Sequence, residues 1–506
     1  MPRYGRWAAA LAASALAGTS VAAQLLPNAL GEATSPLPPT SPPALPLPAV
    51  PLPAVPLPAV PKPTPIAGAV EIPKVGSPPL IESGTLLGTG VAPLKTILST
   101  NPLGAVHVGP VELTASGNLL SPPAGLSASP TLQLSTYQLA NALPATAASL
   151  EAARKRRLQD LIRHNPQVLE ADDQGHPVVR GKLLVLDPHP DLLDRARLAG
   201  FQVISDRLDP DLRIRVAELG VPAGLGAAQS LRRLRSLAPG VQADFDHIFE
   251  PAGGTLGSAS ARVATARYGG RPLIGMVDGG VADHPSLAGA AIEQKGFAGI
   301  VRSSAHGTAV ASLLVGRQGR FRGAAEGASL AVADVYGGRS AAGSASAILR
   351  GLGWLAAKQP RVINISLVGP PNRLLAAAIK GVQARNIDVV AAIGNDGPAS
   401  PPQYPASYSG VVAITGVDAG GRALPEAGNA AHVDFAAPAA DMAAARPGEG
   451  YERVRGTSFA APLAAGRLAK VRSVEQLAVE ARPGKGRVGR GVVCAACRTD
   501  PADLRR

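Results

Sequence analysis

Residues 273–280 read LIGMVDGG, an uninterrupted apolar run followed by an aspartate and two glycines. Further short apolar runs follow, with Ala-rich stretches between them: SLAVADV (329–335), VINISL (362–367), VVAAI (389–393) and VVAITGV (411–417). Continuous apolar runs, without alternation of apolar and polar residues, predict strands that are buried on both faces. We therefore expect an α/β fold over residues 265–495, with a parallel β-sheet flanked by helices.

Four polar residues lie at the carboxyl end of a predicted strand or at the start of a predicted helix. Parallel α/β sheets usually place their functional residues at these positions. The four residues are Asp278 after LIGMV, His306 at the start of HGTAVASLLVG, Asn395 within AAIGNDGP and Ser458 within GTSFAAPLAAG. Taken singly, each has an ordinary explanation as a turn, cap or packing residue. Together they supply what peptide hydrolysis by a serine requires: a nucleophile, a base, an orienter for the base and a donor for the developing oxyanion.

The order Asp, His, Ser along the chain is that of the subtilisin-like peptidases, or subtilases. DGGVADHPSL resembles the family's aspartate motif, HGT its histidine motif and GTSFAAP, at residues 456–462, its serine motif. VINISLVGP (362–370) and YPASYSGVVAITGVDA (404–419) resemble further segments of the family, in the right order between the motifs. The resemblance extends over roughly residues 265–495, about half of the chain.

The resemblance implies a serine endopeptidase that acts on a peptide or protein substrate through an acyl-enzyme. Its catalytic triad would be Asp278, His306 and Ser458, and Asn395 would donate to the oxyanion. The substrate-binding residues implied are Ser366, Leu367, Val368 and Gly394. We expect no cofactor, and no metal, because the sequence holds no Asp-rich calcium loop.

Two residues depart from the family's pattern. Gly279 follows the aspartate where the family usually has Ser or Thr, which removes a hydroxyl near Asp278. Val368 replaces a glycine of the family's substrate-binding strand. We expect Val368 to narrow the pocket for the side chain that precedes the scissile bond.

The N-terminal part of the chain differs in composition from the rest. A basic start, an apolar run over residues 7–18 and small residues after it predict a signal peptide over 1–23. Residues 24–147 are poor in charge and repeat PLPAV over 46–60, which predicts a disordered, Pro-rich spacer, or else a ligand for a Pro-recognising module. We expect an exported protein, periplasmic or secreted, without an integral membrane segment.

Residues 148–255 show a second pattern of elements. Strand-like runs over 178–186, 201–216 and 241–248 enclose helical runs over 190–199 and 225–237. This order predicts a small α/β sandwich, and its position resembles the subtilase propeptide, which assists folding and then blocks the active site. The resemblance implies an intramolecular chaperone and inhibitor, released by a cut between about 250 and 265.

The remaining signals are weaker. The basic run over 154–157 is interpreted as an exposed helix face in preference to a processing site. The formal net charge is +13, but only 3% of residues are aromatic, so nucleic-acid binding is not expected. Cys494 and Cys497 lack a thioredoxin-like or zinc-site context, which leaves a local disulfide or two unpaired thiols. Residues 496–506 are expected to form a C-terminal tail.

Two rival functions stay open at the level of sequence. One is a catalytically inactive subtilisin-like scaffold or peptide-binding protein. The other is a basic surface-binding protein that works through its Pro-rich arm.

Overall fold

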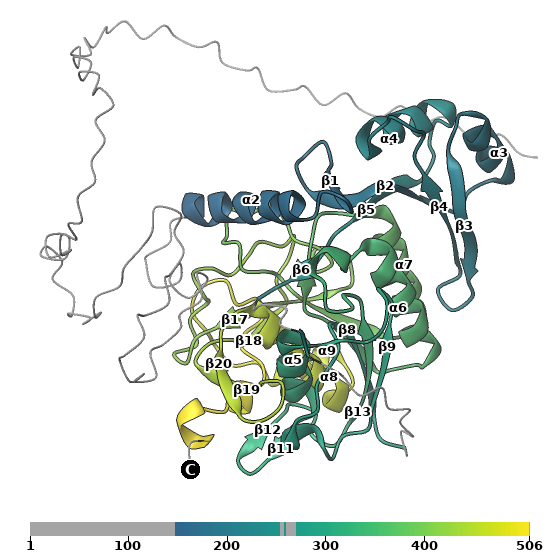
Figure 1. Ribbon diagram of the computed structural model, residues 1–506. Helices are drawn as coiled ribbons and strands as arrows, with labels where there is room; N and C mark the ends of the chain where they lie inside the picture. Colours follow the sequence, from purple (N-terminus) through teal and green to yellow (C-terminus); the bar gives the residue numbers. More distant parts are fainter. Residues whose placement is uncertain (1–146, 254–257, 260–269, 505–506) are drawn as a thin grey trace, which may run out of the picture. The chain divides into compact units, whose positions relative to one another are not determined.

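The computed structural model describes residues 147–253, 258–259 and 270–504 (Figure 1). The predicted signal peptide and all but the last residue of the predicted spacer lie outside the described residues. Most of the predicted cut region after Gly253 also lies outside them.

A seven-stranded sheet forms the centre of residues 270–504, and all its neighbouring strands run parallel. In spatial order the strands are β18 (Phe435–Pro438), β17 (Val412–Val417), β16 (Asp388–Ala392), β14 (Val362–Ile365), β8 (Leu273–Asp278), β13 (Ser329–Asp334) and β9 (Ile292–Gly296). Apart from β9 and the first residue of β16, these strands are buried along their whole length. Burial on both faces explains the continuous apolar runs in the sequence. The predicted α/β fold with a parallel sheet is confirmed.

Helices pack against this sheet in two pairs (Figure 1). Helix α5 (Ala305–Val315) packs on α8 (Thr457–Val471), which lies along β14, β16, β17 and β18. Helix α6 (Ala345–Ala357) contacts β8 and β13, and packs on α7 (Arg373–Gln383). Nearly every residue of α5 and most residues of α8 are buried, which fits their Ala-rich sequences.

Two strands of the sheet, β9 and β18, were not predicted. Strand β9 reads IEQKG and is only partly buried, so its charged residues hide the strand signal. Strand β18 is short and ends in a proline, as an edge strand permits. The predicted strand VINISL divides into β14 and β15 (Leu367–Val368), because β15 leaves the sheet to pair with β6 (Glu250–Pro251).

Residues 147–253 contain an antiparallel sheet and three helices. Its strands are β1 (Leu169–Ala171), β2 (Pro177–Leu186), β3 (Gln202–Asp209), β4 (Ile214–Gly220) and β5 (Ala243–His247), and β2 pairs with β1, β4 and β5. Helices α3 (Pro190–Leu198) and α4 (Ala227–Leu237) share an apolar core with this sheet. A further helix, α2 (Ala147–His164), precedes it. The element order agrees with the predicted α/β sandwich, and its role as a propeptide stays a prediction.

Shorter elements complete the described chain. Two-stranded pairs are β7 (Ser258–Ala259) with β10 (Ser303–Ser304), β11 (Arg317–Gln318) with β12 (Phe321–Arg322), and β19 (Met442–Ala445) with β20 (Tyr451–Val454). Short 3₁₀ turns lie at Pro285–Leu287, Ser340–Ala342, Ala495–Cys497 and Pro501–Leu504.

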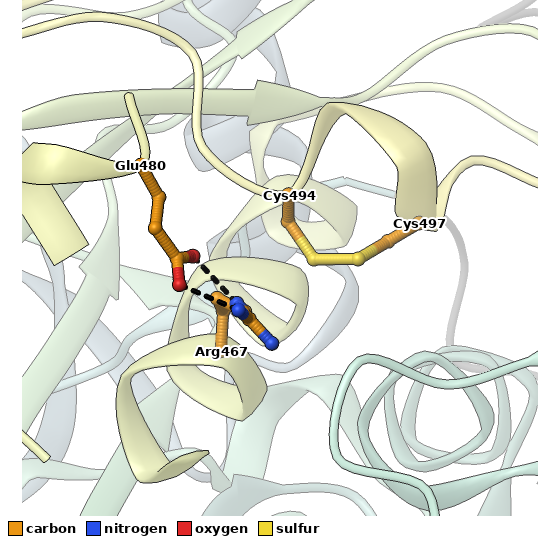
Figure 2. Close-up of a disulfide and its surroundings, with 4 residues drawn as sticks. All are labelled: Arg467, Glu480, Cys494 and Cys497. Carbon is orange, nitrogen blue, oxygen red and sulfur yellow. Dashed lines mark hydrogen bonds and ion pairs between the residues drawn. A yellow bond between two sulfur atoms is a disulfide. The ribbon is translucent and has the colours of Figure 1, made fainter. Parts of the chain in front are cut away.

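Cys494 and Cys497 are joined by a disulfide (Figure 2). Of the two alternatives left open by the sequence, the structure therefore has the bonded one. Figure 2 also shows Arg467 of α8 paired through two hydrogen bonds with Glu480, which follows helix α9 (Val474–Val479).

Within residues 147–253, 258–259 and 270–504, no helix is both long enough and apolar enough to cross a bilayer. The same residues contain no cluster of His, Cys, Asp and Glu side chains suited to a metal ion.

Candidate active site

Asp278 and His306 form a buried, hydrogen-bonded pair. Asp278 is the last residue of β8, and His306 lies in the first turn of α5. The Nδ1 atom of His306 is 2.9 Å from Oδ1 of Asp278, and both side chains are 0% exposed. The same carboxylate oxygen accepts a hydrogen bond from the backbone N–H of Gly279 at 2.7 Å. Because Nδ1 donates to the carboxylate, Nε2 is left as the basic nitrogen of the ring.

The glycine after His306 allows this pair to form. A methyl group on Gly307 would overlap the carbonyl oxygen of Gly279, so only glycine lets α5 approach the end of β8 so closely. The helix start is fixed by Ser304, whose hydroxyl accepts from the N–H of Gly307 at 2.9 Å. The His-Gly pair of the sequence is thus a packing requirement as well as a motif.

Ser458 lies in the first turn of α8 and is fully buried. The helix is preceded by Gly456, whose φ of 133° is open to glycine and strained for other residues. Phe459, the next residue after the serine, contacts the ring of His306, with centroids 5.5 Å apart. Ser458 Oγ and His306 Nε2 are both buried without a hydrogen-bond partner among the described residues. Buried polar atoms are normally paired, so these two atoms call for an explanation in terms of function.

Asn395 is oriented by the start of α8. Its Oδ1 atom accepts from the N–H of Thr457 at 2.9 Å, which orients the amide so that Nδ2 is free to donate elsewhere. Nδ2 donates to the carbonyl oxygen of Ala252. The side chain predicted to serve the oxyanion therefore binds a peptide carbonyl of the chain itself.

The residues around Ala252 run along the predicted substrate-binding strand. In the antiparallel pair of β6 and β15, Pro251 lies opposite Leu367 and Glu250 opposite Val368. The N–H of Ala252 donates to the carbonyl oxygen of Ser366 at 2.9 Å. Ser366 also connects this strand to α8, because its hydroxyl donates to the carbonyl oxygen of Ser458 at 2.9 Å.

A second segment holds the same stretch from its other side. The N–H of Phe249 donates to the carbonyl oxygen of Gly343 at 2.7 Å, and the hydroxyl of Tyr336 donates to the carbonyl of Phe249 at 2.9 Å. The Phe249 ring is fully buried and lies directly over Gly369, where a methyl group would be 2.5 Å from it. Residues 249–252 are thus bound as an added β-strand, a common mode of peptide recognition.

Tyr336 is kept in the state that this contact needs. Burial, followed by the negative charge of Asp278, raises the pKa of Tyr336 well above its usual range. Any tyrosine is protonated at neutral pH, and the raised pKa extends this state of the Tyr336 hydroxyl, which donates to the Phe249 carbonyl, into more alkaline solution.

Gly253, the next residue, lies against the serine. A methyl group on Gly253 would be 2.7 Å from Ser458 Oγ and 3.0 Å from Asn395 Nδ2. Ala252 and Gly253 were not predicted as site residues, although both fall inside the predicted cut region.

Val368 and Gly394 lie against each other, and Val368 is opposite Glu250 in the pair of β6 and β15. Gly394 has a φ of 87°, and a methyl group on it would be 3.3 Å from Cγ1 of Val368 and 3.4 Å from Cγ of Gln403. Val368 itself is 5% exposed. The valine thus fills space on the substrate-binding strand that the family's glycine would leave open.

The Subtilase family matches residues 269–482 of the chain. Subtilisin Savinase of Lederbergia lenta is 32% identical over 204 residues, which are 39% of this chain and 75% of that relative. The chain belongs to the subtilase family. As the family and its subtilisin relatives indicate, this subtilase is a serine endopeptidase.

Other relatives match this subtilase less completely. The major intracellular serine protease of Bacillus subtilis is 32% identical over 209 residues, or 38% of this chain and 65% of that protein. Fervidolysin of Fervidobacterium pennivorans, described as a keratinolytic enzyme related to subtilisin, superposes with a TM-score of 0.54 at 18% identity. The superposition covers 65% of this chain and 62% of fervidolysin, so this subtilase spans less than two thirds of either protein. At that identity the likeness to fervidolysin shows the fold alone.

Proposed function

We propose that this subtilase is made as a zymogen whose first substrate is its own Ala252–Gly253 peptide bond. The observation that carries the proposal is the position of that bond. The carbonyl oxygen of Ala252 accepts from Asn395 while Gly253 lies against Ser458 Oγ. A carbonyl held by an oxyanion donor beside a buried serine hydroxyl is the arrangement that acyl transfer requires.

The chemistry follows from the residues around that bond. His306 Nε2 takes the hydroxyl proton of Ser458 as the oxygen attacks the carbonyl carbon of Ala252. Asp278 holds the imidazole in the required tautomer and stabilises its cation. The side chain of Asn395 and the backbone N–H of Ser458 stabilise the oxyanion. His306 then protonates the leaving amine of Gly253, and water hydrolyses the acyl-enzyme.

Contacts of strand β5 support the role of residues 147–252 as an intramolecular chaperone and inhibitor. Asp246 accepts from the N–H and the hydroxyl of Ser346, at 2.9 and 2.8 Å, in the first turn of α6. Asp244 accepts from the N–H of Arg373, at 2.9 Å, where α7 begins. Carboxylates at helix N-termini accept hydrogen bonds from unpaired N–H groups and interact favourably with the helix dipole. The propeptide-like part, residues 147–252, thus contributes caps to two helices of the catalytic part, described over residues 270–504.

Residues 249–252 also suggest which substrates are cut. Phe249, the fourth residue before the bond, is fully buried, and Ala252, the first, is small. Since Val368 replaces the glycine of the family's substrate-binding strand, we propose a preference for a small residue directly before the scissile bond and a large apolar residue at the fourth position.

Export is proposed from the sequence alone. Residues 1–23 have the composition of a signal peptide, and we propose cleavage after Ala23. Export is consistent with synthesis as a zymogen, because an inhibiting propeptide keeps the protease inactive until it has left the cytoplasm.

Enlarging the residue before the bond should slow self-cleavage. In the full-length precursor, Ala252→Phe is expected to reduce the rate at least about tenfold, because we expect Val368 to narrow the pocket for this side chain. Loss of the precursor band over time measures the rate. Adding Val368→Gly should restore much of it, and Ala252→Ser should cleave like wild type. Equal rates for Ala252→Phe and Ala252→Ser would contradict the narrow pocket.

Removing the oxyanion donor should affect the chemical step more than substrate binding. Asn395→Ala is expected to lower kcat on a peptide substrate by about 10²–10³, the loss found when a subtilisin loses this donor. The KM should change little, because the hydrogen bond strengthens only as the oxyanion develops. Steady-state kinetics measures both constants. A large rise in KM at constant kcat would instead make Asn395 a ground-state binding residue.

The zymogen proposal is tested by incubating purified protein, starting at residue 24, beside its Ser458→Ala variant. Intact mass and N-terminal sequencing should show a new terminus at Gly253 in the wild type alone. A terminus elsewhere would refute this cleavage site. Cleavage of the Ser458→Ala variant at the same rate would show that another protease makes the cut.

A further inference from the structure

The basic run of helix α2 is divided between two environments. Arg154 is buried at 7% exposure, whereas Lys155 and Arg156 face solvent, with 68% of the Lys155 side chain exposed. Arg157 is intermediate. The predicted exposed helix face therefore applies to Lys155 and Arg156 only, and the other two arginines have a different role.

Arg157 and Arg154 bind a carboxylate of the catalytic part. The Nη2 atom of Arg157 donates to Oδ1 of Asp396 at 2.9 Å and to Oδ2 at 3.2 Å, and Arg154 Nε lies 3.6 Å from Oδ2. Arg157 Nε also donates to both carboxylate oxygens of Glu250 at 3.3 Å. Among the described residues, both ion pairs of Asp396 are with α2.

Asp396 lies close to the bound segment, because its side chain and that of Glu250 bind the same arginine. It follows Asn395 directly, and its side chain is only 8% exposed. Asp396, Val368 and Glu250 line one small cavity. Glu250 is the third residue before the proposed cleavage site. The guanidinium of Arg157 therefore bridges the carboxylate of Glu250, in the bound segment, and the carboxylate of Asp396, in the enzyme.

The neighbouring carboxylate already has its own cation. Glu426 pairs with Arg455, at 2.6 and 2.9 Å, within the catalytic part. Asp396 has no such pair among residues 270–504. When α2 leaves with the propeptide-like part, the carboxylate of Asp396 loses the cations that it binds in the precursor.

We propose that Asp396 forms an acidic subsite that binds a cationic side chain at the third residue before the scissile bond. In the precursor Arg157 supplies the guanidinium, which also offsets the charge of Glu250. In the mature enzyme a lysine or arginine of the substrate takes its place. An acidic residue at that position is disfavoured, because it brings two carboxylates together without a cation. This inference rests on the proposed function, since it assumes cleavage after Ala252.

The test compares mature wild-type enzyme with its Asp396→Asn variant on peptides built on Phe-X-Pro-Ala-Gly, where X is Lys, Gln or Glu. For the wild type at low salt, kcat/KM for Lys should exceed that for Glu by about tenfold, with Gln between them. In Asp396→Asn the ratio should fall to about one or two. Because the ratio is independent of the fraction of active enzyme, partial misfolding of the variant does not disturb it. An equal ratio in both proteins overturns the proposal.

A second experiment leaves the mature enzyme unchanged, because α2 is removed with the propeptide-like part. In full-length protein, Arg157→Ala should shorten severalfold the delay between self-cleavage and peptide hydrolysis, since the released part is held less tightly. Lys155→Ala, on the exposed face of the same helix, should leave the delay unchanged. Equal delays for wild type and Arg157→Ala would overturn the role of Arg157 as the ligand of Asp396.

The two proposals fail in different ways. Absence of any cleavage at Ala252–Gly253 refutes the proposed function. Normal cleavage with no preference between Lys and Glu refutes the acidic subsite alone.

Discussion

Replacing Ser458 by alanine is expected to lower kcat on a peptide substrate by about 10⁶, the size of the loss when a subtilisin loses its nucleophile. The reason is that no acyl-enzyme can form, so only binding and the oxyanion donors remain. The change removes a single oxygen, and the hydrogen bond from Ser366 to the backbone carbonyl at position 458 is retained. Steady-state kinetics on mature protein measures the loss. A kcat within about tenfold of wild type would place the nucleophile elsewhere.

A matched serine separates a catalytic role from a capping role. Ser473 is the N-cap of α9, and its hydroxyl accepts from the N–H of Gln476 at 3.1 Å. Ser473→Ala is expected to cost about 1 kcal/mol of unfolding free energy and to leave kcat unchanged. Ser458→Ala should show the opposite pattern, because Gly456 and not Ser458 precedes α8.

Replacing Asp278 by asparagine is expected to lower kcat by about 10⁴ at neutral pH. An amide can donate as well as accept, so it stabilises the His306 tautomer in which Nε2 carries the proton and cannot act as a base. It also leaves the imidazolium of the transition state without a counter-charge in a fully buried site. The KM should change little, because Asp278 has no contact with residues 249–252 among the described contacts.

The asparagine variant keeps the shape of the site, which makes it a sharp test. Its kcat and its rate of labelling by a fluorophosphonate should fall together, since both depend on the basicity of His306. A loss of kcat below about tenfold would show that the Asp278–His306 pair is structural.

Much of the fold could be predicted because the inner strands of a parallel sheet contact only apolar surroundings. LIGMV and VVAITGV keep their apolar character along their whole length, and both form strands close to the predicted bounds. The edge strand β9 could not be predicted in the same way. It is partly open to solvent, so its sequence IEQKG has neither a continuous apolar run nor a clear alternation.

The candidate site was predicted as far as its motifs are local. Asp278, His306 and Asn395 each follow a strand or open a helix, so short patterns identify them. The partners of this site come from far along the chain: Ala252 binds Asn395 and Arg157 binds Asp396. The composition of the basic run 154–157 does not predict which carboxylate its arginines bind, because that depends on how residues 147–253 pack against the catalytic part.

The most direct test of whether Ser458 is the nucleophile is to map where a fluorophosphonate attaches to the wild-type protein. After reaction, proteolysis and mass spectrometry should find a single adduct, on the peptide that carries Ser458. It should appear only once the segment that ends at Ala252 has been released, because Gly253 covers the serine hydroxyl until then. An adduct on a different serine, or no adduct on protein from which residues up to 252 have been removed, would contradict the account.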